Sequence, residues 1–228
     1  MRGAVASPDI WHHPQVYEVL NHASDPDGAV DVALRAIHPW DDAVVVDVGC
    51  GTGFHLPRYA TTARTVVGVE PHPGLAATAR RRCAGQTSVW VRQGTAQQLP
   101  LPDTSVDLVH ARWAYFFGPG CEPGLAEARR VLRHGGTMAV VDVDPEAGDY
   151  GRWFRSAHPG HDPGTVDRFW ARQGFTTVRV ATRWAFGSRE DLAAVLAVEF
   201  PPEVASRAVA ETPGLEFGVG QVVRHRSG

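Results

Sequence analysis

The chain has 228 residues, enough for one α/β domain with a sizeable core but a tight fit for two independent domains. Its formal net charge is −3 and it contains no lysine, which argues against a nucleic-acid partner and excludes Schiff-base lysine catalysis. Three widely spaced cysteines give no disulfide or zinc pattern, and no segment resembles a signal peptide or a membrane span, so the sequence predicts a soluble cytoplasmic protein.

The segment before the first predicted strand is expected to be helical. Residues 11–17 are rich in aromatic side chains and are typical of a lid at the N-terminus. Asp25-Pro26-Asp27 offers a cap and a proline for the first turn of a helix. Apolar residues then repeat at helical spacing up to Ile37, so this helix is expected to pack one face on a sheet.

A run of β-branched residues, Val44–Val48, leads into three alternating glycines, Gly49, Gly51 and Gly53. Glycine lets the backbone turn through angles that side chains forbid, and it lets a ligand lie against the main chain. The helix predicted to begin near Phe54 would direct its N-terminal amides at such a ligand, favouring a carboxylate or a phosphate. The pattern predicts a nucleoside site at the carboxyl ends of parallel strands.

Two acids narrow the choice of nucleoside. Glu70 ends the next apolar run, at the spacing where a carboxylate accepts hydrogen bonds from ribose hydroxyls. The dinucleotide fingerprint places its third glycine three residues after the second, whereas here the third comes two residues after. Asp47 would face a pyrophosphate unfavourably but suits an ammonium group. The pattern therefore favours S-adenosylmethionine over NAD.

Further along the chain, residues 73–83 are expected to form a helix, residues 87–92 a strand, and residues 122–133 a helix capped by Gly135-Gly136. Four motifs follow one another in the order seen in class I S-adenosylmethionine-dependent methyltransferases of the small-molecule type, which the chain resembles. These motifs are Val44–Gly53, Val66–Pro71, Gln93–Val109 and Glu127–Asp142.

This resemblance implies an α/β fold with a doubly wound, mostly parallel seven-stranded sheet, helices on both faces and a C-terminal antiparallel hairpin. It implies a single domain over residues 1–228, with a helical lid at 1–40, a cofactor-binding core at 41–144, and a substrate-side region with the closing strands at 145–228. The expected closing elements are a strand near 176–186, a helix capped by Ser188, and a strand over 215–224.

The resemblance also implies S-adenosyl-L-methionine as the cofactor. The residues expected to bind it are Tyr17, Asp47, Gly49, Gly51, Gly53, Glu70, Pro71, Thr95, Ala96 and Arg112. Thr95 stands where the family usually has an acid, so a charge-assisted hydrogen bond to adenine is lost. Binding would then depend more on the Ala96 amide, on packing by Pro71 and on Glu70.

A general base is harder to assign, because residues 111–117 replace the histidine pair of many relatives with Ala-Arg-Trp-Ala-Tyr-Phe-Phe. His13 is favoured as the base because the N-terminal lid often contributes to such sites. The other candidates are His12, His110, His158 and His161, and His110 also suits a structural role on a buried strand. Asp142 and Asp144 end a strand where metal-dependent relatives keep part of a magnesium site, but the rest of that pattern is missing.

The predicted reaction is methyl transfer to an oxygen, nitrogen or carbon of a small molecule, achieved by proximity and alignment without a metal. Part of an aromatic set is expected to line the acceptor pocket, which indicates an aromatic or hydrophobic acceptor. The set comprises Trp11, Trp113, Tyr115, Phe116, Phe117, Trp153 and Phe154. Two alternatives remain open: a relative that binds the cofactor without transferring methyl, such as a cyclase or a binding module, and an NAD-dependent oxidoreductase.

Overall fold

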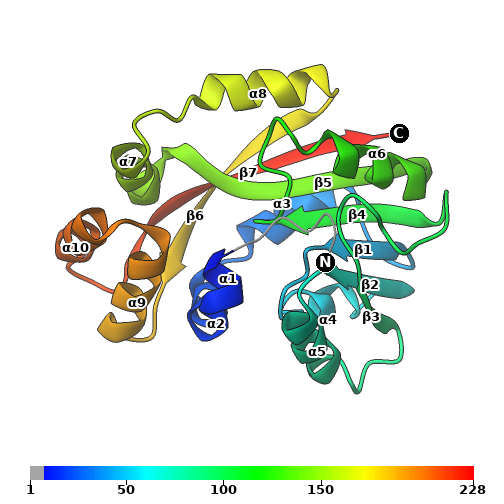
Figure 1. Cartoon of the computed structure of the whole chain (residues 1–228), viewed down its shortest axis with the longest axis horizontal. Helices are drawn as coiled ribbons and strands as arrows, with labels where there is room; N and C mark the ends of the chain where they lie inside the picture. The colour runs from blue at the N-terminus through cyan, green and yellow to red at the C-terminus, as the bar shows by residue number, and fades with distance from the viewer. Residues whose placement is uncertain (1–7) are drawn as a thin grey trace.

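The computed structural model describes residues 8–228, which form a central seven-stranded sheet flanked by helices (Figure 1). The strand order is β3-β2-β1-β4-β5-β7-β6; the first five are parallel, and β7 runs antiparallel between β5 and β6. The predicted fold class is confirmed. The strands are β1 Val44–Val48, β2 Thr65–Glu70, β3 Val89–Gln93, β4 Val106–Arg112, β5 Leu132–Ala147, β6 Thr176–Ala185 and β7 Glu216–Ser227.

The helices in the described part of the chain cover both faces of the sheet and one end of it (Figure 1). They are α1 Pro8–His12, α2 Pro14–Ala23, α3 Ala29–Ile37, α4 Leu56–Tyr59, α5 Pro73–Arg82, α6 Glu122–Val131, α7 Gly148–Ala157, α8 Pro163–Arg172, α9 Arg189–Glu199 and α10 Pro202–Glu211.

The central strands are apolar on both faces because helices cover both sides of a parallel sheet. On one face, alternate residues of β1, β2, β4 and β5 pack against α6 and α8, with Leu125 and Trp170 fully buried. On the other face, the intervening residues pack against α3, α4 and α5, with Val30 and Leu56 fully buried. This double burial explains why the strands appear in the sequence as unbroken valine-rich runs.

A third cluster joins α2 to the C-terminal part of the chain. Helices α2, α7, α9 and α10 pack on the far ends of β6 and β7 around Trp153, Trp184 and Phe217, all of which are buried. This packing holds α2 against α9 and β6, beside the carboxyl ends of the central strands (Figure 1).

Several predicted helix boundaries are wrong by a few residues. The helix expected from Pro26 begins at Ala29, although Asp25 does cap it: its carboxylate accepts hydrogen bonds from the amides of Ala29 and Val30, both at 2.9 Å. The helix expected near Phe54 is the single turn α4. Helix α6 ends at Val131, before the predicted cap, because Leu132 is extended and already starts β5.

The region after Asp144 contains more helix than the sequence pattern indicated. Helices α7 and α8 lie within the Pro/Gly-rich stretch 145–174, and α10 follows the Pro201-Pro202 pair. The helix expected after Ser188 is present, and the Ser188 hydroxyl accepts a hydrogen bond from the Asp191 amide at 3.0 Å.

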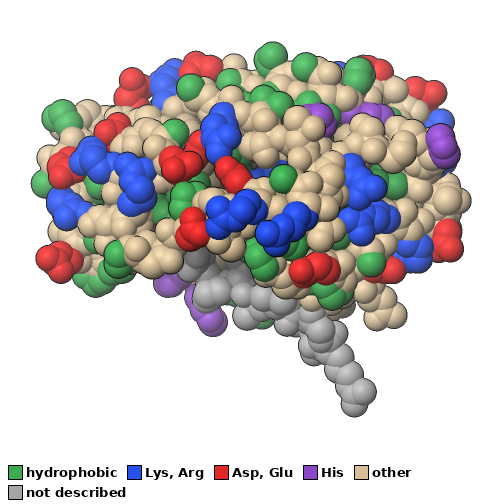
Figure 2. All heavy atoms as spheres, turned by 90° about the horizontal axis from the view of Figure 1, so that it is seen from above, with side chains coloured by type: hydrophobic (Ala, Val, Ile, Leu, Met, Phe, Trp, Pro, Cys, Tyr) green, Lys and Arg blue, Asp and Glu red, His purple; other side chains and the backbone are tan. Residues whose placement is uncertain are grey.

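The exposed surface carries charges of both signs. On the face seen in Figure 2, arginine side chains intermingle with aspartate and glutamate side chains. Ion pairs on the surface of the described residues include Arg179 with Asp167 and Arg183 with Asp27. No helix in residues 8–228 combines the length and the apolar character that crossing a bilayer demands.

Candidate functional site

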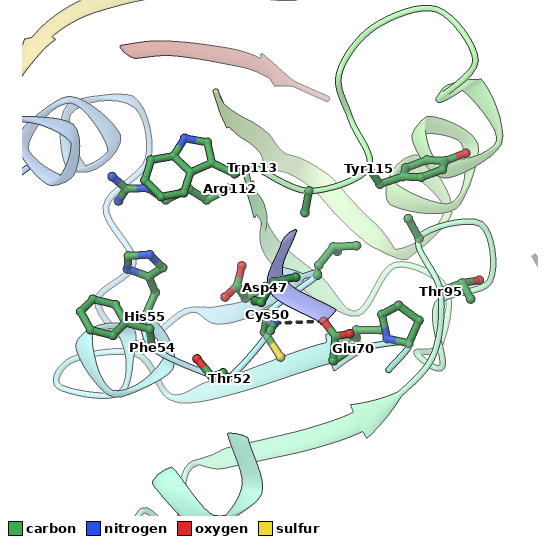
Figure 3. A pocket seen from close by; sticks show the side chains of 18 of the residues that line it. Asp47, Cys50, Thr52, Phe54, His55, Glu70, Thr95, Arg112, Trp113 and Tyr115 are labelled. Atoms are coloured by element: carbon green, nitrogen blue, oxygen red, sulfur yellow. Dashed lines mark hydrogen bonds between the residues drawn. The ribbon is translucent and has the colours of Figure 1, made fainter. Parts of the chain in front are cut away.

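A cavity of about 290 Å³ lies at the carboxyl ends of β1, β2 and β4. We call it the first cavity. All but one of the predicted cofactor residues line it, drawn from α2, the glycine turn, β2, the loop after β3 and the end of β4 (Figure 3). They are Tyr17, Asp47, Gly49, Gly51, Glu70, Pro71, Thr95, Ala96 and Arg112. The exception is Gly53, which does not line the cavity.

The glycine turn after β1 is left-handed at all three glycines, with φ of 78° at Gly49, 56° at Gly51 and 78° at Gly53. A Cβ at Gly53 would lie 2.9 Å from the Ala79 Cβ and 3.0 Å from the Ala79 Cα, so this glycine lets α5 pack close to the turn. At Gly51 the nearest atom to such a Cβ is the Ile10 Cδ1, the end of a flexible side chain, at 2.7 Å. Gly51 therefore presents backbone to the cavity, and Gly53 presents it to the core.

This difference predicts the stability of alanine variants. Gly53→Ala is expected to lower the free energy of unfolding by about 2–4 kcal/mol, because it adds a clash with α5 to the strain of a left-handed alanine. Gly28→Ala is a matched control, since Gly28 has φ of 71° but nothing within 4 Å of the added Cβ. It should cost only about 1 kcal/mol. Urea denaturation measures both, and equal losses would contradict the packing role of Gly53.

Glu70, at the end of β2, connects this strand to the glycine turn through a hydrogen bond. Its side chain is buried, its Oε2 accepts a hydrogen bond from the Gly51 amide at 3.0 Å, and its Oε1 accepts one from the His72 amide at 2.8 Å (Figure 3). Burial raises the pKa of Glu70, and the two amides partly offset that rise. Each carboxylate oxygen can accept a second hydrogen bond, so Glu70 can still bind a pair of ligand hydroxyls.

Asp47 lies across the turn from Glu70 and is also buried. The parallel register of β1 and β4 pairs Asp47 with His110, and Asp47 Oδ1 lies 2.9 Å from His110 Nδ1. The Nε2 of His110 is buried and has no hydrogen-bond partner among the described residues. His110 therefore orients Asp47 from below the cavity, consistent with the structural role considered for it, and Asp47 presents negative charge to a ligand.

Arg112, the last residue of β4, is a buried cation in the cavity wall. It is 9 % exposed, and no described residue lies within hydrogen-bond distance of its Nε or its Nη2. Its guanidinium carbon lies 4.9 Å from the centre of the Trp113 ring (Figure 3). Burial lowers its pKa. Because buried N–H donors without acceptors are costly, Arg112 is poised to bind an anionic group.

The segment after β4 is strained where it borders the cavity. Trp113 and Tyr115 have φ of 50° and 44°, a left-handed conformation that is unfavourable for large side chains. Both side chains line the first cavity, and a Cβ at Gly49 would lie 2.5 Å from the Ala114 Cβ between them. Strain of this kind persists where surrounding structure enforces it, commonly at ligand sites.

A second cavity of about 390 Å³ adjoins the first. Tyr17, Trp113 and Phe117 line both cavities. The other aromatic side chains of the second cavity are Tyr150, Phe154 and Trp184. A cavity of this size, lined by aromatic side chains on one side, suits a small organic ligand.

The polar side of the second cavity is formed by the C-terminal hairpin, the end of β5 and α8. Arg179 Nε lies 3.2 Å from Asp144 Oδ2, and Arg179 Nη2 lies 2.8 Å from Asp167 Oδ2. Arg224 Nη2 lies 3.2 Å from Asp167 Oδ1. Asp142 also lines the cavity, and burial raises its pKa to about 6, although Arg224 opposes that rise.

Some predicted site residues lie elsewhere. His13 directly precedes α2, is exposed and lines neither cavity, so its role as a base stays a prediction. Phe116 and Trp153, from the predicted aromatic set, are buried in the core. His161 lines the second cavity. Within residues 8–228, no group of three or more His, Cys, Asp or Glu side chains is arranged to hold a metal ion.

Sequence reasoning missed several residues of the second cavity. Arg224 and Arg179 were not considered, although each is a charged residue within a β-branched run of a predicted strand, which is a signal for a partnered or functional charge. Glu199 and Tyr150 were also missed; the Tyr150 hydroxyl donates to Glu199 Oε2 at 2.6 Å. Asn21, in the first cavity, gave no signal in the sequence.

Comparisons with known proteins agree with this geometry. A family model described as a methyltransferase domain matches residues 46–140. An uncharacterized protein of Mycobacterium tuberculosis is 30 % identical over 158 residues, which cover 67 % of this chain and 56 % of that protein. A demethylmenaquinone methyltransferase of Deinococcus radiodurans is 35 % identical over 115 residues, which cover 49 % of this chain and 48 % of the enzyme. The chain thus spans about half the length of these curated relatives.

Among solved structures, a putative methyltransferase from Bacillus halodurans superposes with a TM-score of 0.62 at 17 % identity, covering 88 % of this chain and 98 % of that one. This likeness extends well beyond the residues 46–140 that the family model matches. At this level of identity it shows a shared fold.

Proposed function

We propose that this chain, which belongs to the S-adenosylmethionine-dependent methyltransferases with a Rossmann-like fold, transfers the methyl group of S-adenosylmethionine to a small molecule. One observation carries the proposal: a single cavity combines a glycine turn, a strand-end carboxylate and a buried arginine with two unpaired N–H donors. The name of the Deinococcus relative, an enzyme of demethylmenaquinone, supports a small acceptor.

The residues of the first cavity fit the parts of this cofactor. In the proposal, Glu70 binds the ribose hydroxyls, and Thr95 and Ala96 lie beside the adenine together with Pro71. Arg112 binds the carboxylate of the methionine part, which satisfies donors that are otherwise buried and unpaired. Asp47 attracts the ammonium group, and the exposed backbone of Gly51 allows the ligand to approach the main chain.

The chain's own contribution to the reaction is alignment and exclusion of water. When bound, S-adenosylmethionine supplies an electrophilic methyl group, to which an acceptor lone pair bonds as the C–S bond breaks and leaves its electron pair on sulfur. Tyr17, Trp113 and Phe117 border both cavities and would hold the acceptor beside that methyl group. Their rings can also attract the sulfonium charge.

The proposed division of the chain follows from the two cavities. Residues 1–40 act as a lid, of which Trp11 and Tyr17 line the first cavity. Residues 41–144 hold the cofactor, and residues 145–228 complete the acceptor side within the same domain. We propose that transfer needs no metal and that the accepting atom is an oxygen, nitrogen or carbon.

Isothermal titration calorimetry of the purified chain tests the cofactor assignment. S-adenosylhomocysteine is expected to bind with a Kd of about 10 μM or below, and NAD is expected not to bind at the same concentrations. Release of S-adenosylhomocysteine in the presence of a panel of small acceptors would then demonstrate transfer. An empty titration with S-adenosylhomocysteine, or tighter binding of NAD, would refute the proposal.

A further inference from the structure

We propose that the second cavity binds an aromatic acceptor through its hydroxyl group, with Asp142 accepting the hydroxyl proton and Arg224 donating hydrogen bonds to the oxygen. The inference rests on the proposed function, which it extends by naming the acceptor class, the base and the atom that is methylated. It concerns a site that the sequence pattern left open and that the N-terminal histidines do not reach.

The walls of the second cavity favour a planar aromatic acceptor. Six aromatic side chains line it, and they come from α2, the strained segment after β4, α7 and β6. They are Tyr17, Trp113, Phe117, Tyr150, Phe154 and Trp184. Rings of this kind pack well against the faces and edges of another ring. A volume of about 390 Å³ accommodates a molecule of one or two fused rings.

Strand pairing places Asp142 and Arg224 on the same face of the sheet, at the floor of this cavity. Asp142 on β5 pairs with Val222 on β7, and Val140 pairs with Arg224, so the two charged residues are diagonal neighbours. Side chains in this relation lie within reach of each other across an antiparallel pair. Both residues line the second cavity.

Arg224 retains hydrogen-bond donors for a ligand. It is 4 % exposed, and Asp167 accepts only from its Nη2. Its Nε and Nη1 are buried without a partner among the described residues. Donors left in this state at a cavity wall favour a ligand oxygen, because an unpaired buried donor costs more than a hydrogen bond contributes.

Asp142 provides the complementary acceptor. Its Oδ1 accepts a hydrogen bond from the adjacent Val143 amide at 2.8 Å, and the residue is half-buried and lines the cavity. Burial raises its pKa to about 6, which makes it a stronger base than an ordinary aspartate while leaving it mostly ionised at neutral pH.

A hydroxyl is the group that satisfies both residues, because it donates one hydrogen bond and accepts others. An ammonium group would face the Arg224 donors with charges of the same sign. A carboxylate would face Asp142 in the same unfavourable way. The pair therefore selects against both ions, and this selection defines the acceptor class.

The pair also explains how a hydroxyl could be activated without a histidine. The O–H bond breaks with its electron pair remaining on the oxygen, and the proton passes to the Asp142 carboxylate. The Arg224 N–H groups stabilise the resulting oxyanion. The oxygen lone pair is then available for the transfer, and Asp142 afterwards gives the proton to water. The products are a methyl ether and S-adenosylhomocysteine.

The test uses 4-nitrophenol as the probe, because its phenol and phenolate forms absorb at different wavelengths. It is titrated into the full chain at mildly acidic pH in the presence of saturating S-adenosylhomocysteine. We expect the probe to bind and to shift to the phenolate spectrum. We expect 4-nitroanisole, whose oxygen carries no proton, to bind at least roughly tenfold more weakly.

Four variants locate the effect. Asp142→Asn and Arg224→Met should each weaken probe binding roughly tenfold or more and abolish the phenolate shift. Glu146→Gln changes an exposed carboxylate of the same strand that lines neither cavity, and it should bind as the parent does. Thermal unfolding checks that each variant is folded, and Arg224→Lys, which keeps the charge, should restore part of the shift if Arg224→Met is unstable.

Equal affinity for 4-nitrophenol and 4-nitroanisole, or a bound probe that keeps the phenol spectrum in the parent, would overturn the inference. So would tight binding of benzylamine that depends on Asp142, which would indicate an amine acceptor. If S-adenosylhomocysteine binds in all of these samples, such results reject the acceptor class alone. If the parent protein does not bind S-adenosylhomocysteine, the proposed function itself is rejected.

Discussion

Arg112→Met is expected to weaken S-adenosylhomocysteine binding roughly a hundredfold while leaving the ligand-free protein at least as stable as the parent. The loss of affinity corresponds to about 3 kcal/mol, a typical value when charge-assisted hydrogen bonds to a ligand carboxylate are removed. Calorimetry measures the affinity, and urea denaturation without ligand measures the free energy of unfolding.

Affinity is expected to fall while stability does not, because of the environment of Arg112 in the ligand-free protein. Its Nε and Nη2 are buried and unpaired, so the native protein bears the cost of desolvating them. Methionine has a similar length and no charge, and it can keep the contact with the Trp113 ring. Replacing Arg112 therefore removes an unfavourable feature of the ligand-free fold together with a binding contact.

Arg58→Met is the matched control for this experiment. Arg58 contributes to α4, lines neither cavity, and its Nη1 lies 2.6 Å from Asp31 Oδ1. Its replacement should leave S-adenosylhomocysteine affinity unchanged. If Arg112→Met bound the ligand as tightly as Arg58→Met does, Arg112 would not contact the carboxylate, and its unpaired donors would need another explanation.

Glu70→Ala should reduce S-adenosylhomocysteine affinity by about two to three orders of magnitude. Two hydrogen bonds from ribose hydroxyls to a buried carboxylate would be lost, at about 1.5–2 kcal/mol each. The variant also leaves the Gly51 and His72 amides without their acceptor, so the free energy of unfolding should fall by about 2 kcal/mol. The fold itself should remain intact, because Glu70 lies at the carboxyl end of β2 and is not part of the hydrophobic core clusters.

Glu70→Gln separates these two effects, because its amide oxygen can still accept one backbone hydrogen bond while the charge is gone. We expect it to recover most of the stability and little of the affinity. Glu122→Ala is the control for a turn carboxylate: Glu122 Oε2 accepts from the Gly120 amide at 2.7 Å but lines neither cavity. Unchanged affinity in Glu70→Ala would remove the ribose assignment.

The first cavity could be predicted from the sequence because its parts are local. The glycine turn follows β1 and Glu70 ends β2, and these two strands are adjacent in the sheet and close in the chain. The turn needs glycine for its backbone angles, and the strand end needs an acid for its charge. Gly53 shows the limit of this reasoning, since its proximity to Ala79 depends on how α5 packs. The sequence alone does not distinguish a glycine required by packing from one required by a ligand.

The polar pair of the second cavity could not be predicted in this way. Asp142 and Arg224 come together only because β7 inserts antiparallel between β5 and β6, and that register depends on the whole sheet. Asp142 was a candidate from the sequence because it ends a predicted strand, whereas no local pattern indicated Arg224 as its neighbour. The proximity of Asp142 to Arg224 therefore depends on long-range strand pairing, which the sequence position of either residue does not reveal.

The missed helices have a different cause. Asp162 caps α8 by accepting from the Gly164 amide at 2.9 Å, and Pro163 occupies the first turn, so a helix start was present in the sequence. The density of proline, glycine and histidine around it suggested a loop instead. In α7, Tyr150, Trp153 and Phe154 follow helical spacing, but the pattern spans too few turns to stand out.

The first and second cavities share lining residues but are otherwise formed mostly by different parts of the chain. The residues that line the first cavity lie within residues 10–117, whereas Arg224, with its unpaired donors in the second cavity, is on the last strand. Under the proposed function, substitutions on β7 are therefore expected to change the preference for acceptors while leaving cofactor binding unchanged. Acceptor selectivity and cofactor affinity could then evolve independently in this fold.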